Sequence, residues 1–225
     1  MAVITISRQT GSGGDEIAAL VCKQMGYQYF DKAMLAKAAS EETQSEVDFL
    51  KFTDEDLVKG SGLMNRLLAA MGGGSGAAVQ MRTWAEDANG QRSMQVVQLD
   101  ESRAIQLVQN AVRYVAGQGN VVIMGRGAQV ILKDHPGALH VRIEAPWEDR
   151  VQRIKLRYDL RGEGARTEAQ NLIARRDDAR ADYVRRFYDV NVKDAQLYHL
   201  LVNTGKLSIE AAARLIVAAA KLLPA

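Results

Sequence analysis

The pattern of apolar and polar positions predicts a strand, a helix and a second strand within the first thirty residues. Residues Ala2 to Ile6 are mostly apolar or β-branched and run into a Gly-rich turn, as is typical of a buried strand. From about Gly14 to Met25 the apolar positions recur with helical spacing, and the pattern stops at Gly26. Tyr27 to Phe30 predicts a short second strand.

The second half of the chain continues this alternation. The predicted elements are a helix over about 100–116, a strand Val121–Met124, a strand Leu139–Ile143, helices over about 146–158 and 167–188, a strand over about 199–202 and a helix 208–222. Strands that alternate with helices imply crossover connections and a mainly parallel sheet. The expected fold class is therefore an α/β three-layer sandwich.

The segment from Ser40 to about Leu99 differs from the rest. It is polar and contains the Gly/Ser run Met71-Gly72-Gly73-Gly74-Ser75-Gly76, a composition typical of a flexible loop or hinge between helical pieces. We interpret it as an insertion into a single domain of residues 1–225. Either a surface excursion or a segment that closes over a substrate fits this composition.

Composition and charge exclude several classes of protein. The 225 residues carry a formal net charge of +2, whereas proteins that bind nucleic acid generally have a strong basic excess. The single cysteine, Cys22, falls on the apolar face of the first helix and is expected to be a buried thiol. We find neither a signal peptide nor an apolar stretch long enough to span a bilayer, so we expect a soluble, cytoplasmic protein with no nucleic-acid or membrane partner.

The Gly-rich turn Ser7–Ile17 is the strongest chemical clue. It lies between a predicted buried strand and a helix, where free N–H groups and the helix dipole favour an anion. Glycines allow the backbone to approach a ligand closely, although the same residues could form only a tight turn. The candidate phosphate-binding residues are Thr10, Gly11, Ser12, Gly13, Gly14, Asp15 and Glu16.

This turn departs from the usual phosphate-loop pattern G-x-x-x-x-G-K-[ST]. Arg8 occupies the position of the first glycine, Gly14 that of the lysine, and the following position has no hydroxyl side chain. Arg8 could supply the missing positive charge. Glu16 could hold Mg²⁺ in place of the hydroxyl, because this ion prefers oxygen ligands.

Further arginines follow the third and fourth predicted strands. Gly125-Arg126-Gly127 comes directly after a strand, at the edge where α/β proteins bind ligands, and Arg126 could reach a phosphate or pair with a nearby carboxylate. Arg153, Arg176 and Arg180 lie on the later helices. They could close over a phosphoryl group, or they could belong to a solvated helix face.

Three segments together resemble the cytidylate kinase-like family: ITISRQTGSGGDEIA with MGYQYFDKAML, then VVIMGRGAQVILKDHPGALHVRIEAPWEDRVQRI, then ARRDDARADYVRRFY. The resemblance covers most of the chain except about residues 40–99. Members of the family keep the double glycine without the standard lysine, but they usually have a basic residue where this chain has Asp15. True cytidylate kinases have aspartates where this chain has Met124 and Gly127.

The resemblance implies a phosphate-loop fold with a parallel five-stranded sheet. It also implies a monophosphate-binding insert at 40–99, a lid at about 155–180 and ATP-dependent phosphorylation of CMP or dCMP with Mg²⁺. It places Arg126, between Gly125 and Gly127, on the acceptor phosphate. Asp31 resembles the start of a substrate-contacting segment, where it could contact substrate or Mg²⁺ through water, or merely cap its helix.

Two functions remain open at this point. One is a nucleoside monophosphate kinase that uses MgATP, which the Gly-Arg-Gly turn and the later arginines favour. The other is a nucleotide- or anion-binding regulatory module that has lost catalysis, which the missing lysine and hydroxyl favour. The sequence indicates no oligomeric state.

Overall fold

A computed structural model describes residues 2–30, 79–86, 92–99 and 101–223 of the chain. The chain divides into two compact units, residues 1–30 with 116–225 and residues 31–115. The first unit contains every described residue of the candidate site and is described first.

The first unit is built on a five-stranded parallel sheet with the order β2-β5-β1-β6-β7. Its strands are β1 (Val3–Arg8), β2 (Gln28–Phe30), β5 (Val121–Met124), β6 (Ala138–Glu144) and β7 (Leu200–Asn203). In the central strand, Ile6 is in register with Met124 on one side and Val141 on the other. Because all strands are parallel, their carboxyl ends lie along one edge of the sheet, where the Gly-rich turn leaves β1.

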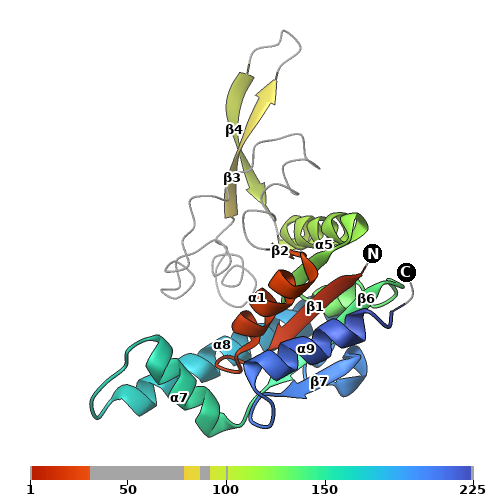
Figure 1. Cartoon of the computed structure of the whole chain (residues 1–225). Helices are drawn as coiled ribbons and strands as arrows, with labels where there is room; N and C mark the ends of the chain where they lie inside the picture. The colour runs from red at the N-terminus through yellow and green to blue at the C-terminus, as the bar shows by residue number, and fades with distance from the viewer. Residues whose placement is uncertain (1, 31–78, 87–91, 100, 224–225) are drawn as a thin grey trace. The chain divides into compact units, whose positions relative to one another are not determined.

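Helices α1 (Gly14–Met25) and α9 (Ile209–Ala220) cover one face of this sheet (Figure 1). The main core lies beneath them: Ile4 and Ile6 of β1, Val122 of β5 and Val141 of β6 pack on apolar residues of the two helices. Cys22 packs against this core from the apolar face of α1, as expected, but it is only partly buried and not the buried thiol that the sequence predicted. The core fixes α1 on the sheet, and α1 begins at the Gly-rich turn.

Helices α7 (Trp147–Arg157) and α8 (Ala165–Tyr188) form a hairpin with a small core of its own. Val151 and Ile154 of α7 pack on Ala169 and Ile173 of α8, and all four side chains are fully buried. A four-residue helix, α6 (Ala128–Ile131), follows β5, and a 3-10 turn, Ala195–Leu197, precedes β7. The hairpin brings the arginines of α7 and α8 to the same side of the unit as the Gly-rich turn.

Most elements of the first unit agree with the sequence analysis. The parallel five-stranded sheet and the α/β class are confirmed, and α1 and β5 have the expected bounds. The short helix α6 and the 3-10 turn were not expected, since both are too brief to show a period.

The second unit contains an antiparallel pair of strands, β3 (Val79–Glu86) and β4 (Arg92–Leu99), and most of α5 (Glu101–Gln118). The polar composition of 40–99 predicted flexible or helical structure throughout, which is wrong for these two segments. Apolar and polar residues alternate in Val79-Gln80-Met81-Arg82 of β3 and, over shorter runs, in Met94-Gln95-Val96 of β4, and this is the period of a strand. The rest of the expected insertion, its glycine run included, and the helix expected from Asp31 lie outside the described residues.

Candidate phosphate site

The turn between β1 and α1 is held tightly against neighbouring elements. Gly11 and Gly13 have φ angles of +79° and +80°, a conformation that strains any other L-residue. A Cβ atom on Gly11 would lie 2.8 Å from the carbonyl oxygen of Arg150, and one on Gly13 would lie 2.2 Å from Ile209. Backbone conformation therefore favours glycine at both positions, and at Gly11 the backbone of Arg150 also leaves no space for a side chain.

The turn presents backbone donors at the start of α1. Within the part of the chain that the structure describes, the N–H of Ile17 bonds to the Gly13 carbonyl, whereas no donated hydrogen bond is found for the N–H groups of Gly11, Gly13, Gly14, Asp15 and Glu16. N–H groups at a helix N-terminus, together with the helix dipole, favour a phosphate oxygen. The local geometry is that of an anion-binding loop.

Arg153 and Thr204 hold the carbonyl side of the loop. The buried hydroxyl of Thr204 donates to the carbonyl of Ser12 at 2.7 Å. Arg153 donates to the hydroxyl and the carbonyl of Thr204, at 2.8 and 2.9 Å, and its Nη1 lies 3.4 Å from the carbonyl of Gly11. Arg153, predicted as a catalytic arginine, therefore positions the loop in this structure.

Asp177 of α8 connects the hairpin to the loop. Its carboxylate accepts from the N–H and the hydroxyl of Thr10, from Arg180 at 3.1 Å and from Arg150 at 2.5 Å. Arg180 also donates to the Thr10 hydroxyl at 2.7 Å. Asp177 is thus a carboxylate shared by two arginines and the loop.

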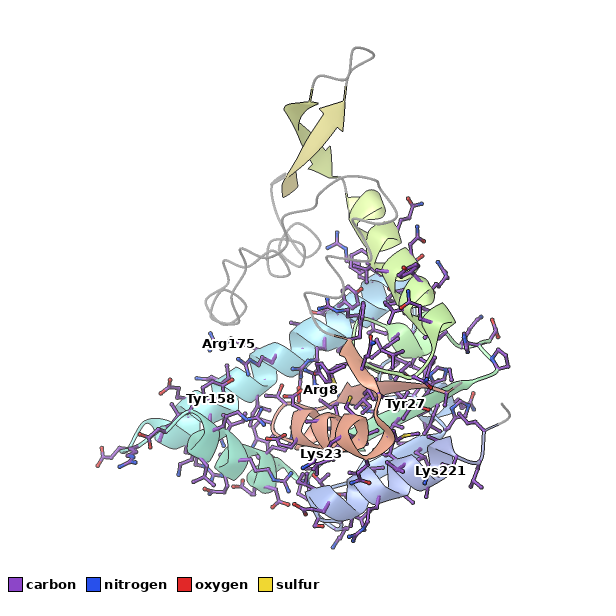
Figure 2. The ribbon with its side chains drawn as sticks, turned by 45° about the horizontal axis from the view of Figure 1, so that its top comes forward. Arg8, Lys23, Tyr27, Tyr158, Arg175 and Lys221 are labelled. Carbon is purple, nitrogen blue, oxygen red and sulfur yellow. The ribbon has the colours of Figure 1, made fainter. Side chains whose placement is uncertain are left out.

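A second group of charges covers the first turn of α1. Arg8 donates to Asp15 at 3.1 Å, and Arg157 of α7 pairs with Asp15 at 3.4 Å and with Glu16. Figure 2 labels Arg8 beside α1. The negative charges of Asp15 and Glu16 are therefore balanced by arginines.

The charges around the loop shift one another's pKa. Burial acts to raise the pKa of Asp15, but Arg8, Arg157 and Arg180 outweigh this effect, and the pKa lies below its ordinary value. Burial, and next the nearby charge of Arg8, lower the pKa of Arg180 to about 10. Both groups are ionised at neutral pH, and the repulsion between two neighbouring guanidinium groups favours a bound anion.

The Gly-Arg-Gly turn after β5 has an unusual backbone. Gly125, Arg126 and Gly127 all have positive φ angles, 70°, 60° and 70°. For a residue with a side chain, this conformation costs roughly 1–2 kcal/mol. The hydroxyls of Tyr183 and Tyr188 lie 3.4 and 3.5 Å from the Arg126 carbonyl, and the Tyr188 ring occupies the space where a Cβ of Gly127 would lie.

Several predicted site residues are brought together. The Gly-rich loop collects five of them: Arg8, Thr10, Asp15, Glu16 and Arg180. Arg8 also reaches toward the Gly-Arg-Gly turn, since a Cβ atom on Gly125 would lie 3.3 Å from Nη1 of Arg8. Arg176 instead donates to the hydroxyl of Tyr158 and lies over its ring, on the α7–α8 hairpin where Figure 2 labels Tyr158. Asp31 lies outside the described residues.

Thr204, Tyr183 and Tyr188 contact the two turns and were not among the predicted site residues. Thr204 directly follows β7, and residues after the carboxyl ends of parallel strands are the usual ligand-side positions, so this rule alone could have selected it. The two tyrosines carry no local signal, since their role depends on packing against a turn about sixty residues earlier in the chain.

In the described ranges no group of three or more His, Cys, Asp or Glu side chains is arranged to hold a metal ion. The helices that are described include none with the length and apolar character needed to cross a membrane.

Comparison with solved structures supports the fold. An uncharacterized protein from Eubacterium ventriosum is similar with a TM-score of 0.63 at 15% identity, covering 99% of each chain. Shikimate kinase from Bacteroides thetaiotaomicron is similar with a TM-score of 0.50 at 15% identity, covering 98% of this chain and 99% of its own. No curated protein matches the sequence.

The structure is an α/β fold with a five-stranded parallel sheet and a glycine-rich turn between β1 and α1. The sequence matches the cytidylate kinase-like family over residues 3–206. The chain therefore belongs to the cytidylate kinase-like family, as its motifs indicated.

Proposed function

We propose that this protein transfers a phosphoryl group from MgATP to a nucleoside monophosphate, with CMP or dCMP as the preferred acceptor. The observation that carries the proposal is the row of N–H groups at the start of α1, surrounded by arginines from β1, α7 and α8. Backbone donors hold a phosphate chain, and arginines stabilise charge on the group in transfer.

Each element of the site has a distinct role in this proposal. The loop N–H groups bind the donor phosphates, and Arg153 with Thr204 keeps the loop in shape. Arg8 and Arg180 face the transferred phosphate, and Arg176 joins them when residues 155–180 close as a lid. Arg126, held between two glycines, binds the acceptor phosphate, and the 40–99 insertion of this single domain binds the rest of the acceptor.

The residues present fit the phosphates of ATP. Among the described residues, the N–H groups of Gly11 and of residues 13–16 have no acceptor, and Gly13 and Gly14 have no side chains that would keep a phosphate away from them. For Mg²⁺ the natural oxygen ligands would be the phosphates themselves, with Glu16 as the one added carboxylate. Glu16 is paired with Arg157, so it becomes a ligand only when that pair opens. Bound Mg²⁺ would supply charge neutralisation.

A second function has its own support. The N–H and the hydroxyl of Thr10 already donate to Asp177, and Arg8 is already paired with Asp15. A loop whose arginines are satisfied internally is suited to binding a nucleotide or anion without transferring phosphate. This regulatory module is the alternative to the kinase.

A coupled assay of ADP release against a panel of monophosphates separates the two functions. We expect faster release with CMP and dCMP than with AMP and GMP. Equal rates, or a preference for a purine, would remove the cytidine assignment and leave the kinase standing. Nucleotide binding with no ADP release from any acceptor would establish the regulatory module instead.

A further inference from the structure

Gly14 is glycine for lack of space and not for its backbone conformation. It begins α1 and has no positive φ angle, so a side chain would cause no backbone strain there. A Cβ atom at this position would lie 2.7 Å from the Cβ and 2.9 Å from the Cγ of Arg8. The stem of Arg8 fills the place where the side chain of residue 14 would start.

Position 14 is also where the usual phosphate-loop pattern has its lysine. A lysine stem could not leave the backbone here without displacing Arg8. The two cations therefore exclude each other: one comes from the first turn of the helix, the other from the end of the preceding strand.

We infer that Arg8 replaces the loop lysine as the cation on the donor phosphates and that Gly14 is the small residue that makes room for it. The inference rests on the proposed function and extends it, because it identifies which group supplies the missing charge. The side chain of Arg8 passes over Gly14 and places its guanidinium group at the first turn of α1, whereas the usual lysine would start from position 14 itself.

The surroundings of the guanidinium group support this role. Its Nε and Nη2 lie 3.1 Å from one oxygen of Asp15, which fixes its orientation over the helix start. Its Nη1 lies toward Gly125, at the beginning of the Gly-Arg-Gly turn. Arg8 thus extends from the phosphate loop toward the expected acceptor side, and its side chain is only 20% exposed.

Binding of MgATP, measured by calorimetry on the full chain, tests the charge. We expect Arg8→Ala to weaken binding about tenfold to a hundredfold, since a hydrogen bond to a charged group is lost. Arg185→Ala is the matched control, because this arginine pairs with Asp182 on an exposed part of α8, and we expect binding like the parent's. Equal binding by Arg8→Ala and the parent would overturn the inference.

The paired exchange tests whether the two cations are equivalent. Arg8→Gly removes the stem that blocks position 14, and Gly14→Lys then restores the first glycine and the lysine of the usual pattern. We expect the double variant to bind MgATP more tightly than Arg8→Gly alone. If the double variant folded but bound MgATP no more tightly than Arg8→Gly, the inference that Arg8 does the work of the loop lysine would be overturned.

The fit of Arg8 over Gly14 is measured separately, by thermal unfolding without nucleotide. Gly14→Ala should lower the melting temperature of the parent, because the new Cβ crowds Arg8. In the Arg8→Gly background it should raise the melting temperature, because alanine favours a helix more than glycine does. If Gly14→Ala changed the melting temperature equally in both backgrounds, the inference that Arg8 fills the space beside Gly14 would be overturned.

Failure of the proposed function would give a different result. If the parent released no ADP with any acceptor, the kinase would be wrong, yet the MgATP and melting experiments would still decide the role of Arg8.

Discussion

The carboxylate of Asp177 accepts hydrogen bonds from both the backbone N–H and the hydroxyl of Thr10, each at 2.8 Å. The two residues are 167 positions apart, so this contact joins the start of the domain to helix α8. Arg150, with a side chain only 8% exposed, has its charge neutralised by the same carboxylate. The shape of the phosphate loop therefore depends on the helical hairpin.

Asp177→Ala should destabilise the fold as well as the site. It leaves the guanidinium of Arg150 and the N–H of Thr10 without this partner, and removing one member of a buried ion pair costs about 3–5 kcal/mol. Because Asp177 itself is partly exposed, we expect the lower part of that range or somewhat less, about 2–3 kcal/mol. Urea unfolding measures this loss.

Asp182→Ala is the matched control for this change. Asp182 also pairs with an arginine three residues later on α8, but both side chains are well exposed. Such a pair contributes at most about 1 kcal/mol. If the two variants unfold at the same urea concentration, Asp177 does not hold the loop as the structure indicates.

Arg126→Ala should raise the Michaelis constant for the monophosphate more than that for ATP. A bidentate contact to the acceptor phosphate contributes about 1.5–3 kcal/mol, or roughly ten- to hundredfold in affinity. Initial rates with each substrate varied in turn provide the measurement. If a folded Arg126→Ala variant kept its affinity for the monophosphate, Arg126 would have only a structural role in the Gly-Arg-Gly turn and would not bind the acceptor.

Gly127→Ala provides a second perturbation of the same turn. A Cβ there would lie 2.4 Å from the ring of Tyr188, and the φ angle of 70° is unfavourable for alanine. We expect it to change the affinity for the acceptor while leaving that for ATP nearly intact. An equal loss for both substrates would mean that the turn supports the whole domain and not the acceptor side.

Local patterns in the sequence predicted the parallel sheet and the phosphate loop. The run from Val3 to Gly14 changes from β-branched residues to glycines and then to helical spacing, and each change has a direct conformational cause. The elements with a clear period were placed correctly. The strands β3 and β4 were missed because the polar composition around them was given more weight than their own alternation.

The contacts between arginines and their partners were beyond the reach of the sequence. Arg153 and Arg176 are both helical arginines of the hairpin, yet one donates to or lies near the carbonyls of Thr204 and Gly11 and the other lies on Tyr158. Which arginine reaches the loop depends on how α7 and α8 pack, and that is set by contacts distant in the chain.

Glu16→Ala should weaken nucleotide binding or turnover most strongly at low Mg²⁺. Arg157 donates to Glu16, and in the proposed site the carboxylate is exchanged between Arg157 and the ion. Titration of activity with Mg²⁺ should show a higher requirement in this variant than in the parent. Glu148→Ala is the control, since that glutamate forms an exposed pair with Arg166. If the parent, Glu16→Ala and Glu148→Ala all required the same Mg²⁺ concentration for half-maximal activity, Glu16 would be excluded as a ligand.

A buried histidine predicts how stability depends on pH. His140 lies in β6, bonded through Nδ1 to the hydroxyl of Thr5 and stacked on His199 with ring centroids 5.0 Å apart. Burial, and next the nearby His199, lower the pKa of His140 from 6.5 to about 4. The native protein therefore holds this ring neutral under conditions where the unfolded chain protonates it.

The free energy of unfolding should fall as the pH decreases from about 6.5 toward 4, because the unfolded chain then binds a proton that the native His140 does not. A shift of this size corresponds to at most about 3 kcal/mol. His140→Gln removes the titrating group, so we expect the variant to start less stable at pH 7.5 and to lose less stability on acidification. Urea unfolding of both proteins at pH 7.5 and pH 5 measures the difference. An equal loss in parent and His140→Gln would show that His140 does not control the acid sensitivity of the fold.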